Sequence, residues 1–255
     1  MTGAPQAPAL ASSWLPLAWL ILSLALLLIL ERWLNRHLQG FLLLVTGNPD
    51  WVMYVNFLLL LPGILLHEFS HWLAAQLLGV HSGGIILFPK KRGARQIHYG
   101  SVQIGPADPL RHSLIGLAPL LAGSTAVLLC ARYGLQLAPL SSPASWDELL
   151  AHLGAPDAPL WLYLIFAISN AMLPSKSDRQ PWGPVMLFSA AIALLLLVTG
   201  VAAQIPPEIT RGVLHGVSYL AYAFSLTVVV DLLAALLIVA LENVAGVLLR
   251  RRVQY

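Results

Sequence analysis

Two kinds of residue are scarce in this sequence, and each scarcity excludes a class of protein. Charged residues make up 10% of the 255 positions, whereas a soluble domain carries about 25%. A water-soluble enzyme and a disordered protein are therefore excluded. Cys130 is the single cysteine, so the chain has neither an internal disulfide nor a cysteine-rich metal site. The formal net charge of +3 is small, and we expect no nucleic-acid partner.

Long apolar segments fill much of the chain. Hydrophobic residues make up 58% of it, and a helix of about 20 apolar residues crosses the hydrocarbon of a bilayer. Six segments approach this length: residues 14–29, 51–80, 113–131, 160–173, 184–203 and 217–249. The sequence therefore predicts an all-α integral membrane protein with about six transmembrane helices. We expect one polytopic domain over residues 1–255, surrounded by the lipid bilayer and without a soluble accessory domain.

Lysine and arginine are unevenly distributed between the segments that connect these spans. They gather in the second connection, in the fourth connection and at the C-terminus, which six alternating spans place on one side. Cytoplasmic segments of membrane proteins are enriched in these residues. The sequence thus predicts both termini in the cytoplasm, for a protein of the prokaryotic cytoplasmic membrane. Residues 41–46 are apolar but too short to cross, so we expect them to lie in the interface or to re-enter the membrane.

The second connection, residues 81–111, is more than a linker. Residues 85–88 and 96–104 are rich in β-prone side chains, and a basic turn containing Gly93 separates them. This pattern predicts a short β-hairpin against the cytoplasmic face of the membrane. The alternative is a solvated loop whose basic side chains contact anionic lipid.

The second predicted span contains His67, Glu68 and His71 in an HExxH pattern. Residues four apart lie on one face of a helix, so both imidazoles can reach one metal ion. Glu68 lies about 100° around the helix from His67, given 3.6 residues per turn, and can act as a base without being a ligand. Ionisable groups in a transmembrane helix are costly unless they are paired or bound to metal. The alternative is a polar cluster that binds neighbouring helices and no metal.

A catalytic zinc site usually has three protein ligands, so one ligand must come from elsewhere in the chain. The fourth predicted span ends in a polar stretch that contains Asn170 and Asp178. Because the second and fourth spans run in the same direction, we expect this stretch to lie near the same membrane face as the HExxH pattern.

These motifs resemble the site-2 proteases, a family of intramembrane zinc metalloproteases. The resemblance includes the HExxH helix with Ala75 and Gly79 after it, and Asn170 and Asp178 at the spacing of the family's second signature. Weaker similarities are Ile86-Leu87-Phe88-Pro89 and Gly116-Leu117-Ala118-Pro119. Leu173 stands where the family usually has proline, and Arg179 stands where glycine usually follows the aspartate. Both departures leave the ligand spacing intact.

The resemblance implies a role for each motif residue. His67, His71 and Asp178 are expected to hold one Zn²⁺ per chain, and Glu68 is expected to be the catalytic base. Asn170 is expected to help position the substrate; its alternative role is an interhelical hydrogen bond. The expected activity is that of a zinc metalloendopeptidase that hydrolyses peptide bonds of membrane-embedded or membrane-proximal substrates near the cytoplasmic face.

Two other functions remain open at the level of the sequence. The first is a non-proteolytic zinc protein that binds membrane clients, although a structural site does not need a base at Glu68. The second is an ion or proton transporter, which requires further charges along a path within the membrane. Asp231 in the last span is one such charge. The expected partner of the protease is a membrane protein or peptide substrate.

Overall fold

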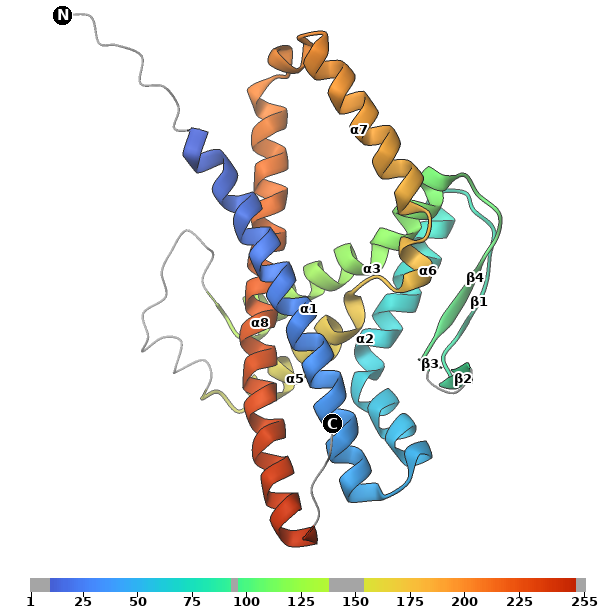
Figure 1. The fold of residues 1–255 in the computed structure, drawn as a ribbon, viewed down its shortest axis with the longest axis vertical. Coiled ribbons are helices and arrows are strands. Elements are labelled where there is room, and N and C mark those ends of the chain that lie inside the picture. Colours follow the sequence, from blue (N-terminus) through green and yellow to red (C-terminus); the bar gives the residue numbers. More distant parts are fainter. Residues whose placement is uncertain (1–9, 93–95, 138–153, 251–255) are drawn as a thin grey trace, which may run out of the picture.

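The computed structural model describes residues 10–92, 96–137 and 154–250, and consists mainly of helices (Figure 1). Within the N-terminal half, α1 and α2 precede four short strands. The bounds are α1 (Leu10–Thr46), α2 (Pro49–Leu77), β1 (Ser82–Ile86), β2 (Lys90–Arg92), β3 (Gln96–His98) and β4 (Ser101–Ile104). The remaining elements are α3 (Pro109–Leu129), η1 (Cys130–Gly134), α5 (Ala158–Met172), α6 (Lys176–Arg179), α7 (Trp182–Val198), η2 (Val201–Gln204) and α8 (Pro207–Leu249).

Apolar helices of membrane-spanning length dominate the fold. Five described helical segments are long and apolar enough to cross a membrane, whereas six spans were predicted. The remaining predicted span corresponds to α5, which has 15 residues and is therefore about 22 Å long at 1.5 Å per residue. The hydrocarbon core is about 30 Å thick. The α-helical character with membrane-length helices is thus confirmed, and the count of six is not.

The first helix is much longer than predicted. Residues 14–29 were expected to span, with residues 41–46 as a separate interfacial segment, but α1 continues without interruption to Thr46. A turn at Gly47 and Asn48 follows at once, where the Asn48 side chain accepts a hydrogen bond from the Asp50 amide. Polar residues between positions 31 and 39 suggested a loop, but none of them is a helix breaker. The prediction of a separate segment was wrong for this reason.

The long helices α1 and α8 pack side by side and run in the same direction (Figure 1). The Trp19 indole N–H donates to Ser225 Oγ at 2.8 Å, and His37 Nδ1 lies 3.0 Å from Glu242 Oε2. Contacts that advance together along both helices define parallel packing. Six alternating spans with both termini on one side require the first and last spans to be antiparallel. The structure contradicts that arrangement for the described helices.

The chain path from α5 to α7 explains this difference. Both helices rise in Figure 1, with the short α6 between them, so they follow one another in the same overall direction. The helix breaks after Met172, where Leu173 is extended and Pro174 follows. Two predicted spans of opposite direction are therefore replaced by one interrupted path.

The predicted hairpin is present, in two pieces. β1 pairs antiparallel with β4, with Ile85 opposite Val102. β2 pairs antiparallel with β3, with Lys91 opposite Ile97. The predicted strand 96–104 is thus interrupted at residues 99–100, and residues 93–95 lie outside the described part of the chain. The Figure 1 view places the hairpin alongside α2.

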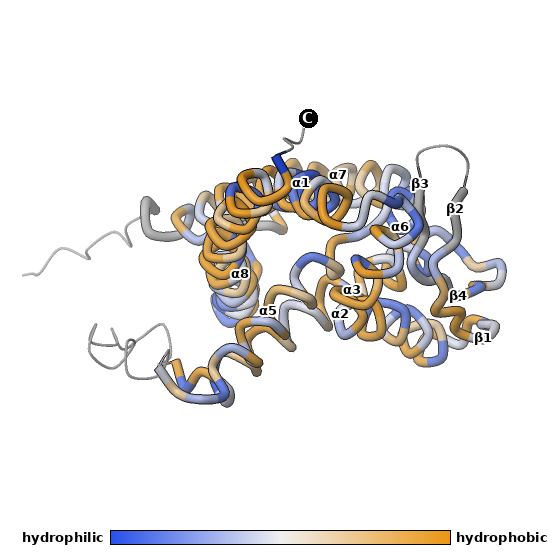
Figure 2. Tube along the Cα trace, turned by 90° about the horizontal axis from the view of Figure 1, so that it is seen from below, coloured by the Kyte–Doolittle hydropathy of each residue, from blue (hydrophilic) through white to orange (hydrophobic). Residues whose placement is uncertain are grey.

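The packed centre of the molecule surrounds α2. Its largest cluster of buried side chains combines residues of α1, α2, α5 and α8, including Leu34, Ile64, Ile165 and Val230. Figure 2 shows hydrophobic residues along much of α3, α5 and α8. By contrast, α7 has no buried residue. A helix that is apolar and unburied is suited to contact with lipid.

Candidate metal centre

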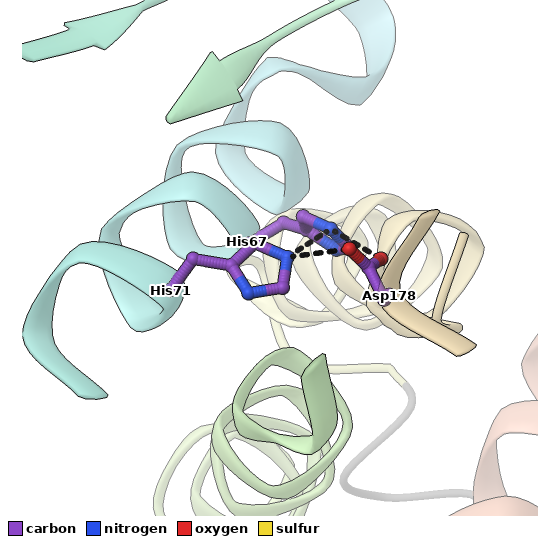
Figure 3. A group of neighbouring side chains, drawn as sticks. All are labelled: His67, His71 and Asp178. Carbon is purple, nitrogen blue, oxygen red and sulfur yellow. Dashed lines mark hydrogen bonds and ion pairs between the residues drawn. The ribbon is translucent and has the colours of Figure 1, made fainter. Parts of the chain in front are cut away.

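His67 and His71 lie on the same face of α2, one turn apart. Their Nε2 atoms are 3.1 Å from each other, and their rings are nearly perpendicular, with an interplanar angle of 80°. The predicted four-residue spacing therefore brings the two Nε2 atoms close together on one side of the helix. Figure 3 shows both rings directed from α2 towards Asp178.

Backbone carbonyls of two other helices orient these rings. His67 Nδ1 lies 2.6 Å from the Ala171 carbonyl oxygen in α5, and His71 Nδ1 lies 2.9 Å from the Ile115 carbonyl oxygen in α3. A carbonyl oxygen only accepts, so each Nδ1 carries the proton and donates it. In the neutral rings both Nε2 atoms then keep their lone pairs, which is the form that binds a metal.

Asp178 approaches the histidines from the short helix α6. Its Oδ1 lies 3.4 Å from His71 Nε2, and its Oδ2 lies 3.7 Å from His67 Nε2. The carboxylate is held by Ser175, whose backbone N–H donates to Asp178 Oδ2 at 2.7 Å. Ser175 Oγ accepts in return from the Asp178 amide at 3.3 Å, which completes a capping box.

Gly116 allows α6 to lie directly against α3. A side chain at Gly116 would collide with the backbone carbonyl of Asp178. Because backbone atoms cannot rotate away as a flexible side chain can, glycine at this position is required for the observed approach of Asp178 to the histidines.

The three side chains fit a tetrahedral metal site. Ligand bonds of about 2.0 Å place tetrahedral donor atoms about 3.3 Å apart. The observed separations are 3.1 Å, 3.4 Å and 3.7 Å, and all candidate ligand atoms lie within 4.8 Å of one another. Two imidazole nitrogens and one carboxylate oxygen also form a donor set that zinc accepts. His67, His71 and Asp178 could therefore hold one metal ion.

Glu68 lies beside this group and is 7% exposed. Its side chain packs against Gly100 at the interruption of the hairpin. A Cβ atom added at Gly100 would lie 2.7 Å from Glu68 Cγ and 2.8 Å from Glu68 Oε1. The backbone of Gly100 thus forms one wall of the space that the Glu68 carboxylate occupies.

Asn170 makes the interhelical hydrogen bond that was its alternative role. Its Nδ2 donates to Asp231 Oδ1 in α8 at 2.9 Å and to the Phe166 carbonyl oxygen at 2.9 Å. Ser169 Oγ donates to the same Asp231 oxygen at 3.4 Å. The sequence named no partner for Asp231, and the structure supplies these two. A role of Asn170 in positioning substrate stays a prediction.

Two cavities meet at the candidate metal centre. We call them the β4 cavity and the α1 cavity, after elements that line them. The β4 cavity has a volume of about 660 Å³ and includes Asp178 and Val102 in its wall. The α1 cavity has a volume of about 1120 Å³ and lies between α1, α2 and α8. His67, Glu68, Gly100 and Ser175 line both.

Sequence reasoning missed a polar face of α1 that lines the α1 cavity. It consists of Glu31, Arg32, Asn35, Arg36 and Gln39. Their spacing places them on one side of a helix, and this regular spacing was the available signal. Gly100 was also missed, and Gly116 was noted only as part of a weak family similarity; the room that both glycines make for Glu68 and Asp178 follows from the structure alone.

Comparisons with protein-family models, with curated proteins and with solved structures gave no match for this chain. The similarity to site-2 proteases therefore rests on the motif residues themselves.

Proposed function

We propose that the protein is an intramembrane zinc endopeptidase that cleaves membrane-embedded or membrane-proximal peptides. One observation carries the proposal. His67, His71 and Asp178 converge from α2 and α6, and both Nδ1 atoms lie within hydrogen-bond distance of backbone carbonyls. Glu68 lies next to this group at the junction of two cavities. A structural metal site needs no carboxylate base in that place.

The residues around the site have separate tasks in peptide hydrolysis. Zinc held by His67, His71 and Asp178 would supply a Lewis acid, which can lower the pKa of water to about 7. The Glu68 carboxylate accepts a proton from the water molecule that attacks the peptide carbonyl, and it then returns this proton to the leaving amine. The carbonyls of Ala171 and Ile115 keep the imidazole rings in the ligand orientation. Ser175 keeps the Asp178 carboxylate directed at the histidines.

β4 is suited to hold the substrate in an extended conformation. Ser101, Val102 and Ile104 of this strand line the β4 cavity. Within the described residues β4 pairs only with β1, which leaves its second edge for another strand. A transmembrane substrate helix must unwind before the peptide bond to be cleaved can reach the candidate metal centre. The N–H and C=O groups released by unwinding then need new hydrogen-bond partners, because lipid offers none. Strand addition to β4 supplies such partners next to the metal ligands.

The proposal is tested by metal content and cleavage in the same preparations. Purified protein is expected to contain one zinc per chain and to cleave a single-span peptide. Glu68→Gln is expected to keep the zinc and to lose at least about 10²-fold in cleavage rate, as a missing general base predicts. His67→Ala is expected to lose both. Equal cleavage by wild type and Glu68→Gln would reject the proposed mechanism.

Ion or proton transport is a second candidate, because ionisable residues lie within the apolar helices. Glu31 lines the α1 cavity, and Asp231 is 0% exposed in α8. Charges inside a membrane protein often mark an ion path. Asp231 does not line either described cavity, which weakens this candidate. Uptake of radioactive zinc or of protons into sealed vesicles, with no peptide cleavage, would favour it.

A further inference from the structure

The α1 cavity combines an apolar wall with a group of basic side chains. Leucines of α1, α2, α3 and α8 form the apolar part, including Leu24, Leu60, Leu120 and Leu220. Four basic residues that we call the basic group line the same cavity: Arg32, Arg36, Lys176 and Arg179.

The basic group is assembled from two elements distant in sequence. Arg32 and Arg36 lie one turn apart on α1, and Lys176 and Arg179 belong to α6, which also carries Asp178. All four side chains are exposed. Within the part of the chain that the structure describes, none of them forms an ion pair with a carboxylate. Glu31 interacts electrostatically with Arg32 and Arg179, but one carboxylate leaves the four cations with a net positive charge that is available to an anionic ligand.

The two cavities differ in charge. The residues that line the β4 cavity include no lysine or arginine among the described residues. The α1 cavity carries the whole basic group, against Glu31 and Glu68. An extended peptide held at the metal centre extends to both sides of the cleaved bond, so its two flanks lie in different electrostatic environments.

We propose that this site selects substrates that carry acidic side chains on one flank of the cleaved bond, the flank that lies in the α1 cavity. This inference rests on the proposed function. A peptide fits better than a lipid headgroup because His67 and Glu68 form part of the same wall. An occupant of the α1 cavity therefore reaches the groups that perform the reaction. Basic side chains in a partly apolar cavity bind carboxylates more strongly than they do in water.

The test compares four peptides in vesicles of neutral phosphatidylcholine. Each peptide has the same single-span sequence, with a pair of glutamates before the cleaved bond, a pair after it, glutamines at all four positions, or a pair of lysines in place of the favoured glutamates. Wild type is expected to cleave one glutamate peptide about tenfold better in kcat/KM than the glutamine peptide, as charge-assisted hydrogen bonds predict. The other glutamate peptide is expected to show no gain. Equal kcat/KM for all four peptides would overturn the inference.

Charge reversal locates the effect. Arg32→Glu combined with Arg36→Glu is expected to abolish the preference for glutamate and to favour the lysine peptide. The matched control is Arg211→Glu, which removes an exposed arginine of α8 that pairs with Glu208 outside both cavities. This control is expected to keep the wild-type preference. An unchanged preference in the double variant would also overturn the inference.

A binding measurement separates this inference from the proposed function. Photo-crosslinking of the same peptides to zinc-loaded Glu68→Gln protein reports preference without catalysis. If binding prefers the glutamate peptide while wild type cleaves nothing, the proposed proteolytic function is rejected and the α1 cavity is supported as a binding site for acidic peptides. If the double variant instead loses retention of phosphatidylglycerol and keeps its peptide preference, the basic group is a lipid site and the inference fails.

Discussion

Each histidine of the candidate centre uses one nitrogen to fix its ring and directs the other at the position that a metal ion could occupy. The same principle applies to Asp178, whose carboxylate is held by the amide of Ser175. Groups that orient metal ligands typically change metal affinity by about 10–100-fold when they are removed. Residues that never touch the metal are thus part of the site.

We predict that Ser175→Ala weakens zinc binding by about tenfold, because the capping box that fixes α6 loses its hydroxyl acceptor. Competition with a chelator of known affinity measures the change. Ser218→Ala serves as the control, since Ser218 Oγ donates to the Leu214 carbonyl within its own helix. Equal zinc affinity in both variants would contradict a positioning role for Ser175.

Gly100→Ala is predicted to disturb catalysis and to leave metal binding intact. The added Cβ would lie 2.7 Å from Glu68 Cγ, so the Glu68 side chain must move. A displacement of about 1 Å in a catalytic group can cost about 10²-fold in rate. Zinc content and kcat measured together test this prediction. Gly84→Ala is the matched control in β1, because no atom lies within 4 Å of an added Cβ there.

Local spacing predicted part of this site and omitted the rest. His67, Glu68 and His71 lie within five residues of sequence, so helix geometry alone brings them together. Asp178 required the family resemblance, because its approach depends on Gly116 and on the packing of α3. The carbonyls that orient the rings belong to the backbone, and every residue has one. Their role follows only from the tertiary structure.

At the level of single elements, the free edge of β4 leads to a testable prediction about substrate docking. Neighbouring residues of a strand direct their N–H groups to opposite edges. One of Val102 and Gln103 therefore offers its N–H to the edge opposite β1. We predict that Val102→Pro or Gln103→Pro greatly reduces cleavage while zinc content is unchanged. Val102→Ala and Gln103→Ala, which keep the backbone donor, are expected to remain active; full activity of both proline variants would exclude β4 as the docking strand.

The parallel packing of α1 and α8 predicts a specific pattern of crosslinks. In a Cys130→Ser background, the pairs Trp19→Cys with Ser225→Cys and His37→Cys with Glu242→Cys are expected to react with a short bismaleimide. Their native side chains are in direct contact. The pair Trp19→Cys with Glu242→Cys is expected not to react. A reversed pattern on denaturing gels would restore the antiparallel arrangement.

For the whole molecule, composition predicted the class of fold and could not predict its path. Length and hydropathy identify apolar helices because they are local properties. The direction of a span depends on whether the chain reverses between two apolar segments. The polar break between α5 and α7 resembles an ordinary loop in the sequence, yet both helices continue in one direction. Likewise, the polar residues of α1 suggested a connection between two apolar segments, yet they lie in the middle of one long helix.

The contacts of the two histidine rings also make the metal centre a structural junction. His67 is bound to α5 at Ala171, across 104 positions of sequence, and His71 is bound to α3 at Ile115. A ligand that binds only the assembled state stabilises it by about 2.7 kcal/mol when its concentration is 100 times the dissociation constant. Zinc bound at this centre, as proposed, would link metal availability to the integrity of the helix bundle. In a cell short of zinc, newly made chains would then lose the proposed activity and resistance to degradation together, so the abundance of the protein would follow the metal supply.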